Sequence, residues 1–281
     1  MRLPGAEPCS RFTAMFEAIV IDLLKVAPFS AVAKHMGLSW HQVDGIQGRA
    51  VQRGLRRWEV QPVSELAVDE TSFQRGHEYV TVVSDRSRNV VLHVADDRRQ
   101  QTLESYYESL PQKHLDAIEV VTMDMWAPYI AATERAVPGG AGKIAFDKFH
   151  VAGHLGDAVD KVRRQEHREL SARGDQRLKG TKHDWLRSPS THDRIRNKER
   201  FEALRTSTLR TARAWSLKEA AMDAWEHRKE SDVRAMLKWW SAWADRSRLE
   251  PMRKVSRMVK KHLQGIVTAI LRKATNAGAE S

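Results

Sequence analysis

The spacing of apolar residues changes twice along the chain, and these changes constrain the fold more than any other feature. Before Pro62 and after about residue 150, apolar residues recur every three or four positions, as on one face of a helix. Between them, short β-branched runs are separated by turn residues, which is typical of strands. The five predicted strands cover residues 66–70, 79–83, 90–94, 117–122 and 143–146. With helices at 102–110, 127–136 and from 149 onward, the order is β-β-β-α-β-α-β-α, and we expect an α/β protein with a mixed sheet.

Composition limits the kind of protein further. The chain has 281 residues, of which 41% are hydrophobic and 30% charged, and this balance is typical of a globular protein. It contains no apolar run long enough to span a membrane and no signal peptide pattern at the N-terminus. The single cysteine, Cys9, excludes an internal disulfide and a cysteine-based zinc site in this chain. We therefore expect a soluble, cytoplasmic protein without a membrane partner.

Positive charge is concentrated in the second half of the chain. The formal net charge is +11, and residues 151–281 hold 30 Lys and Arg against 17 Asp and Glu. Residues 1–150 hold 17 basic and 19 acidic residues, so the whole excess lies in the later part. Such a basic region favours a polyanionic partner, of which nucleic acid is the commonest. The alternative is that basic helices only keep the protein soluble.

Residues 29–57 have the pattern of a helix-turn-helix. Ser30 is expected to cap a first helix, Gly37 supplies a tight turn, and Ser39 caps a second helix that extends to about Arg57. In such a unit the second helix enters the major groove of DNA. A helical hairpin that never contacts DNA has the same pattern, so both interpretations stay open. The side chains that the second helix would offer to DNA are Trp40, His41, Gln42, Gln47, Arg49 and Arg53.

Two carboxylates follow predicted strands, at positions where catalytic groups are often held. Asp69 ends the first strand and Asp124 follows the fourth. If these strands are neighbours, both side chains lie at one edge of the sheet, where a divalent cation would relieve their mutual repulsion. Carboxylate oxygens suit Mg²⁺ or Mn²⁺, and two such ions could activate water and stabilise the leaving oxygen of a phosphodiester. The alternative is that each acid is only a turn residue or a helix cap.

A set of motifs resembles the DDE transposases of the bacterial ISL-three type. The first block spans residues 67–85 and contains Ala-Val-Asp-Glu-Thr-Ser-Phe, and the second, at 121–129, reads Val-Thr-Met-Asp-Met-Trp-Ala-Pro-Tyr. Phe-Asp-Lys-Phe-His-Val follows at 146–151, and shorter matches lie at 217–219, 252–255 and 275–280. The match runs in order over nearly the whole chain, and several long motifs in order are more specific than any one of them.

The resemblance implies an RNase H-like core and assigns roles to particular side chains. Asp69 and Asp124 would be the first two acids of a two-metal site for Mg²⁺ or Mn²⁺. Asp147 and His150 match an Asp-x-x-His feature near the site of such enzymes and would support it, with a purely structural role as the alternative. Two candidates exist for the third acid, Glu280 in Thr-Asn-Ala-Gly-Ala-Glu and Glu219 in Leu-Lys-Glu. Glu280 is preferred, because related families place the last Glu after a helical insertion.

Two departures from the family pattern bear on activity. Full-length relatives begin with a cysteine-rich zinc ribbon, whereas this sequence has only Cys9 and is expected to start after that position. Relatives also continue beyond the last Glu, whereas this sequence ends one residue after Glu280. A carboxylate at a fraying terminus is poorly held for metal binding. The sequence therefore leaves open whether this chain is active.

The domain organisation and function follow from these points. Residues 1–60 are predicted as a helix-turn-helix region, 61–165 as an RNase H-like core, 166–270 as a helical insertion and 271–281 as the start of a final catalytic helix. The predicted activity is two-metal cleavage of double-stranded DNA at insertion-sequence ends, then strand transfer into target DNA by a homodimer. The alternatives are an inactive, truncated transposase that only binds DNA and an RNase H-like nuclease. Phosphates would be contacted by the basic residues of the last helix, Arg253, Lys254, Arg257, Lys260 and Lys261.

Overall fold

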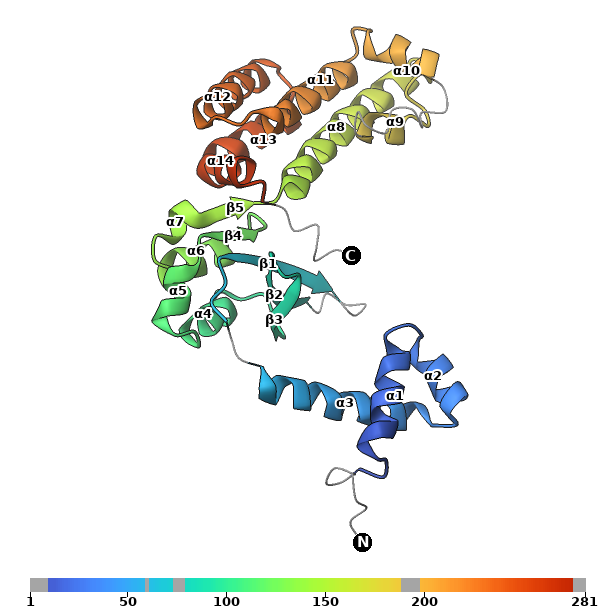
Figure 1. Ribbon diagram of the computed structural model, residues 1–281. Coiled ribbons are helices and arrows are strands. Elements are labelled where there is room, and N and C mark those ends of the chain that lie inside the picture. Colours follow the sequence, from blue (N-terminus) through green and yellow to red (C-terminus); the bar gives the residue numbers. More distant parts are fainter. Residues whose placement is uncertain (1–9, 59–60, 73–78, 188–197, 275–281) are drawn as a thin grey trace. The chain divides into compact units, whose positions relative to one another are not determined.

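The computed structural model describes residues 10–58, 61–72, 79–187 and 198–274. The chain divides into two compact units, Met1–Gln61 and Pro62–Ser281. Each unit is described below by itself (Figure 1). Among the helices of the described residues, none is both long and apolar enough to cross a membrane.

The N-terminal unit consists of three helices, α1 (Ala14–Leu24), α2 (Phe29–Met36) and α3 (Trp40–Arg57). Gly37 ends α2 with a positive φ of 65°, a conformation that glycine adopts without steric cost. Ser39 and Gln42 form a capping box at the start of α3, as the sequence indicated for Ser39. Ser30 does not cap α2: the helix already begins at Phe29, and Pro28, whose ring fixes φ, precedes it. The core of this unit is formed by Val20, Val32, Ala33, Val43 and Ile46.

The second unit is built on a five-stranded mixed sheet, which confirms the predicted fold class. The strands are β1 (Glu65–Ser72), β2 (Tyr79–Asp85), β3 (Val90–Ala95), β4 (Val120–Met123) and β5 (Ile144–Phe146). Their order across the sheet is β3-β2-β1-β4-β5. The first three strands form an antiparallel meander, while β4 is parallel to β1 and β5 is parallel to β4. β1 and β4 are therefore neighbours, as the metal-site hypothesis requires.

The connections of the sheet differ from the prediction in two places. The helices α4 (Gln100–Glu108) and α6 (Ala127–Ala136) lie where the sequence indicated, and they pack together. However, α5 (Gln112–Ala117) occupies the start of the predicted fourth strand, which begins only at Val120. A second unpredicted helix, α7 (Gly140–Lys143), leads into β5. It packs so closely that a Cβ on Gly140 would lie 2.3 Å from the carbonyl oxygen of Thr133.

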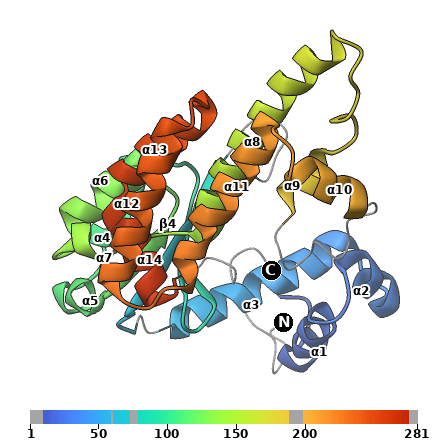
Figure 2. The ribbon, with the colours of Figure 1, turned by 90° about the horizontal axis from the view of Figure 1, so that it is seen from above.

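The described residues after β5 are entirely helical. They form α8 (Lys148–Ser171), α9 (Lys182–Leu186), α10 (Lys198–Arg205), α11 (Arg210–Met222), η2 (Asp223–Glu226), α12 (Glu230–Arg246), α13 (Glu250–Lys261) and α14 (Leu263–Arg272). α11 and α13 pack against α8, and α12 packs against α13 (Figure 2). The predicted stripe of α8 is buried, from Val151 to Val162. One hydrophobic cluster joins these helices to the sheet, and α8 runs across the predicted boundary at residue 165. The division into a core and an insertion therefore stays a prediction.

Candidate active site

The register of the parallel strands brings three aspartates to one edge of the sheet. Ala67 of β1 is level with Thr122 of β4, so Asp69 and Asp124, each two residues further along, are level with one another. The same register between β4 and β5 places Asp147, the first residue after β5, beside Asp124. Because the carboxyl ends of these three strands share an edge, residues that are 55 and 23 positions apart in the sequence come together there.

The first two carboxylates each accept a hydrogen bond from the backbone N–H of the next residue. Asp69 accepts a hydrogen bond from the backbone N–H of Glu70 at 2.8 Å, and Asp124 accepts one from the backbone N–H of Met125. The side chain of Asp124 is 33% exposed, and the Nδ1 atom of His150 lies 3.6 Å from its Oδ1 atom. These contacts fix the direction of each carboxylate, and the partial exposure of Asp124 leaves room for a cation at its oxygens.

Asp147 has a different role from the two acids beside it. Its side chain is fully buried and caps α8 by accepting a hydrogen bond from the backbone N–H of Phe149 at 3.2 Å. Its own backbone N–H donates to the carbonyl oxygen of Met123 at 3.2 Å, which fixes the start of α8 to the end of β4. The cap therefore sets the direction of the helix that carries His150 toward Asp124. The contacts favour a positioning role for Asp147.

Further imidazoles lie around Asp124. His262, between α13 and α14, packs edge-on against Phe146 with ring centroids 5.1 Å apart. Burial lowers the pKa of His262, the charges of Lys261 and His154 act in the same direction, and the Asp124 carboxylate opposes them. His154 and His262 thus lie within electrostatic range of one another. Lowering the pKa favours the neutral form of His262 near pH 7.

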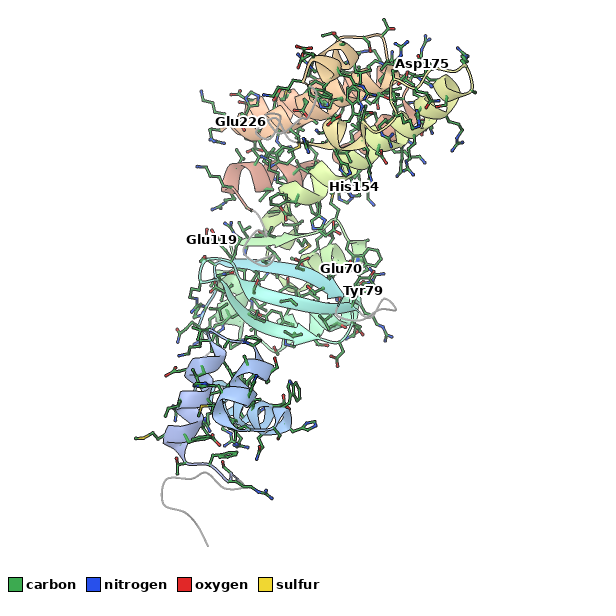
Figure 3. The ribbon with its side chains drawn as sticks, turned by 90° about the vertical axis from the view of Figure 1, so that its right-hand side faces the viewer. Glu70, Tyr79, Glu119, His154, Asp175 and Glu226 are labelled. Carbon is green, nitrogen blue, oxygen red and sulfur yellow. The ribbon has the colours of Figure 1, made fainter. Side chains whose placement is uncertain are left out.

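An arginine lies between two aromatic rings at the same edge of the sheet. The guanidinium carbon of Arg98 lies 4.2 Å from the ring centroid of Tyr79 and 5.0 Å from that of Trp126. Arg98 also donates to both carboxylate oxygens of Glu70 at 3.3 Å. Figure 3 shows Glu70 and Tyr79 together at one end of the strands and Glu119 at the other. No sequence pattern predicted a role for Arg98, because it lies in a polar loop without a motif. Trp126 was predicted only as part of the second motif block.

A buried tyrosine lies beneath the two acids of β1. Its hydroxyl, on Tyr129 of α6, shares a hydrogen bond of 2.7 Å with the hydroxyl of Thr81. Burial raises the pKa of Tyr129, the hydrogen bond with Thr81 opposes the rise, and the Glu70 and Asp69 carboxylates add to it. The raised pKa keeps the Tyr129 hydroxyl neutral near pH 7, while the negative charge lies at the strand ends.

The structure does not gather a complete set of metal ligands within the described residues. Among residues 10–58, 61–72, 79–187 and 198–274, no group of three His, Cys, Asp or Glu side chains could hold a metal ion. Glu219, on α11, instead lines a cavity of about 680 Å³ beside α8 and lies 2.6 Å from Lys218 Nζ. The structure therefore does not bring Glu219 together with Asp69 and Asp124. Glu280 lies outside the described residues.

The residues at the start of α3 fit an exposed recognition surface only in part. Trp40 is 52% exposed and packs against Phe29, with ring centroids 5.6 Å apart, and His41 is exposed beside it. Gln42 accepts a hydrogen bond from the backbone N–H of Ser39 at 2.8 Å, so its side chain is engaged in the cap. Gln47, one turn further along, is half-buried. Trp40 and His41 are therefore the more accessible of these four side chains.

Two of the four arginines of α3, Arg49 and Arg53, link this helix to α1 through a buried carboxylate. Glu17 of α1 is 1% exposed and accepts hydrogen bonds from Arg49 at 2.6 and 2.9 Å and from Arg53 at 2.9 Å. Ser10 donates a further hydrogen bond to Glu17 at 2.7 Å. Burial alone would raise the pKa of Glu17, but these hydrogen bonds outweigh it and hold the pKa below its ordinary value. A role of Arg49 and Arg53 in DNA binding stays a prediction, beside the structural role that their hydrogen bonds to Glu17 show.

The basic residues of α13 fall into two groups. Arg253 and Arg257 pair with Glu250 at 3.4 and 2.7 Å, and Lys260 pairs with Asp245 of α12. Cations in such pairs are partly neutralised within the protein. Within the described part of the chain, the α13 cations without a carboxylate partner are Lys254 and Lys261.

The comparisons with known proteins agree with this architecture. Residues 66–281 match a family model described as a transposase, of the DDE type of family ISL3, and residues 1–51 match the helix-turn-helix domain of transposase family ISL3. A transposase for insertion sequence element IS1001 from Bordetella parapertussis is 25% identical over 88% of this chain and 61% of its own length. A transposase for element IS1557 from Mycobacterium tuberculosis is 25% identical over 95% of this chain and 65% of its own length. The chain thus spans less than two thirds of these relatives, and no solved structure matches it.

A helix-turn-helix unit followed by a mixed sheet with aspartates at its strand ends is the architecture of a transposase. The chain belongs to the insertion-sequence transposase family ISL3, as the resemblance of its motifs indicated.

Proposed function

We propose that this chain cleaves DNA at the ends of an insertion sequence and joins the freed 3′-hydroxyl to target DNA. The observation that supports this most directly is the level position of Asp69 and Asp124 on neighbouring parallel strands. Their mutual repulsion, the exposure of Asp124 and the oxygen chemistry of both groups fit Mg²⁺ or Mn²⁺. Bound ions would supply activation of water and stabilisation of the leaving oxygen. An RNase H-like description of the sheet belongs to the same proposal.

The side chains around this pair have separate tasks in the proposal. Asp69 and Asp124 hold the cations, while the cap formed by Asp147 orients α8 and so keeps His150 at Asp124. Arg98, paired with Glu70 and stacked between Tyr79 and Trp126, keeps the loop after β3 close to the strand ends. These groups bind and orient, so the protein provides a fixed site into which the DNA phosphate is placed.

We propose Glu280 as the third acid, in preference to Glu219. Ala274, the last described residue, is buried against Val120 and Ala145 of the two parallel strands. Glu280 lies six positions after Ala274, and an extended chain of that length spans up to about 20 Å. Strand β4 from Val120 to Asp124 covers only about 13 Å at the usual rise per residue. The chain after Ala274 is therefore long enough for Glu280 to reach the aspartates.

DNA recognition is divided between two parts of the chain in this proposal. The exposed start of α3, with Trp40 and His41, reads base edges in the terminal repeat. The basic helical region contacts phosphates, which sets affinity rather than sequence choice. Because two element ends must be joined, a homodimer on DNA is part of the same proposal.

A cleavage and strand-transfer assay on duplex DNA carrying the native element ends tests this function. With Mg²⁺ or Mn²⁺, the chain is expected to release a 3′-hydroxyl end and to produce joined target molecules, and Asp69→Asn should abolish both products. Asp116→Asn, which changes an acid on α5, is the matched control and should leave both products unchanged. Binding without any cleavage would instead identify a DNA-binding remnant. Cleavage without joined products would identify a nuclease.

A further inference from the structure

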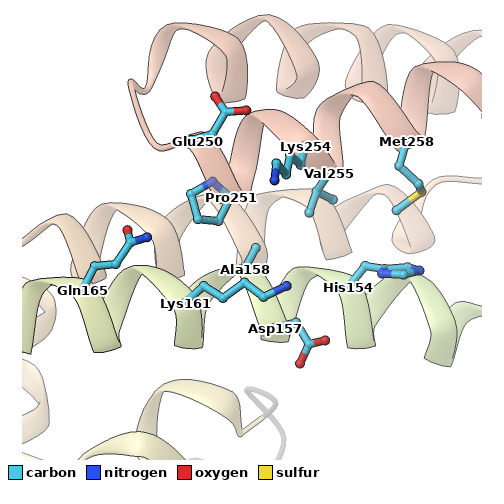
Figure 4. A pocket seen from close by; sticks show the side chains of 10 residues that line it. All are labelled: His154, Asp157, Ala158, Lys161, Gln165, Glu250, Pro251, Lys254, Val255 and Met258. Carbon is cyan, nitrogen blue, oxygen red and sulfur yellow. The ribbon is translucent and has the colours of Figure 1, made fainter.

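A groove between α8 and α13 carries two lysines beside an apolar floor. Its volume is about 380 Å³, which lies within the range of roughly 300–1,000 Å³ usual for ligand sites. Ala158 from α8 and Val255 and Met258 from α13 give it an apolar floor. Lys161 and Lys254 enter from the two helices on the sides that face each other (Figure 4). An apolar floor with ammonium groups along it suits a chain of deoxyriboses joined by phosphates.

The positive charge of this groove is not neutralised by its own carboxylates. Glu250 pairs with Arg253 and Arg257. Asp157 points away from α13 in Figure 4. Within the described residues, Lys161 and Lys254 form no ion pair with any carboxylate. Lys254 lies within electrostatic range of Glu250 but forms no ion pair with it, so both ammonium groups can contact an external anion without breaking an ion pair.

The inner end of the groove adjoins the aspartates of the sheet. His154 lines the groove and follows His150, the neighbour of Asp124, by one helical turn of α8. Lys161 is eleven residues beyond His150, a distance of about 16 Å along the helix axis. One DNA strand advances about 3.4 Å per nucleotide along its axis. The ammonium of Lys161 thus corresponds to a phosphate about five nucleotides from one placed at Asp124.

We propose that the α8–α13 groove holds the sugar–phosphate backbone of the DNA strand that leads to Asp69 and Asp124, with Lys161 and Lys254 as its phosphate ligands. This proposal rests on the proposed function, since it assigns a path to the same DNA. It also separates Lys254 from the other cations of α13, which are engaged with Glu250 and Asp245 or lie outside this groove.

The salt dependence of DNA binding tests the groove without requiring cleavage. Binding of the full chain to a fluorescein-labelled duplex of random sequence is measured by anisotropy over a series of KCl concentrations, with a chelator present. For Lys161→Gln/Lys254→Gln, the slope of log affinity against log salt is expected to become shallower by about 1.8, or about 0.9 for each lost phosphate contact. The control Lys113→Gln/Lys143→Gln removes the same charge from α5 and α7, outside the basic helical region, and should keep the wild-type slope. Circular dichroism establishes that both variants are folded.

A neutral phosphate substitute then locates the contact. Element-end duplexes carry one methylphosphonate at successive positions from the cleavage site, and wild-type affinity is expected to fall most at about five nucleotides. That fall should vanish in the groove variant. An unchanged slope in the groove variant, or an equal loss in the control, overturns the proposal even if the chain cleaves DNA. Conversely, a chain that never cleaves can still show the expected slope, so failure of the groove and failure of the proposed function are distinguishable.

Discussion

Two carboxylates, Glu17 in the N-terminal unit and Asp124 at the edge of the sheet, are held in opposite ways. Glu17 is 1% exposed and receives hydrogen bonds from Arg49, Arg53 and Ser10. Asp124 is 33% exposed, with one backbone N–H and the imidazole of His150 as its described neighbours. The first carboxylate is saturated by the protein, whereas the second retains capacity for a ligand.

The difference in burial and hydrogen bonding between Glu17 and Asp124 determines how each carboxylate affects stability. Removing one partner from a buried ion pair leaves an uncompensated charge in the interior and is strongly destabilising. A partly exposed carboxylate beside a second one gains little from folding, because its neighbour repels it. We therefore expect Glu17 to contribute to stability, whereas Asp124 contributes to the binding that we propose. The comparison makes predictions that differ between the two sites.

The largest expected effect is the loss of cleavage in Asp124→Asn. Removing one member of a catalytic set typically costs on the order of 10⁴-fold in rate, which is about 5.5 kcal/mol of transition-state stabilisation. Folding should be unimpaired, because the substitution relieves repulsion between Asp124 and Asp69. The rate of cleavage of element-end DNA and urea unfolding of the same preparation measure the two effects. If Asp124→Asn cuts at the wild-type rate, the metal-site hypothesis is wrong.

The reverse pattern is expected for Glu17→Ala. The substitution leaves the guanidiniums of Arg49 and Arg53 without their buried partner and should cost about 3 kcal/mol in the stability of the N-terminal unit. Hydrogen exchange of the amides of α1 and α3 should accelerate accordingly, while exchange in the sheet stays unchanged. Ala18→Gly on the same helix, which costs about 1 kcal/mol through helix propensity alone, is the control for general weakening. Equal effects of the two substitutions would show that the ion pairs contribute nothing beyond propensity.

The sequence predicted which helix or strand carries each of these residues better than it predicted which side chains they contact. Local signals placed α1–α3, the strands and the strand-end aspartates, because apolar period and turn residues act over a few positions. The link between Glu17 and the two arginines spans 32 and 36 residues and depends on how α1 packs against α3. No local pattern encodes that choice, so Arg49 and Arg53 were interpreted only as DNA contacts. Arg98 was missed for the same reason, since its aromatic neighbours come from β2 and the start of α6.

Acid should weaken the N-terminal unit through Glu17. Because its folded pKa is lowered from an ordinary value of 4.5, its contribution is fully present above that value. The contribution is lost as the pH falls through the lowered folded pKa, where the folded state must also take up the proton. Hydrogen exchange in α1 measures the free energy of unfolding of wild type and of Glu17→Gln between pH 7 and pH 3. The two free energies should therefore become more similar as the pH falls. A constant difference across this range would contradict the assignment.

Arg98 is paired, as Glu17 is, but it is 39% exposed, so its substitution should have the smallest effect. Its pair with Glu70 and its contacts with Tyr79 and Trp126 together contribute about 1 kcal/mol at such a site. Arg98→Met should lower the free energy of unfolding of the sheet unit by that amount in urea. Arg98→Lys should recover only the part due to charge, since an ammonium lacks the flat face that stacks between two rings. Arg99→Met, at the exposed neighbouring position, should change stability by less than about 0.5 kcal/mol. If Arg98→Lys is fully as stable as wild type, stacking contributes nothing, and the loop after β3 is held by the ion pair alone.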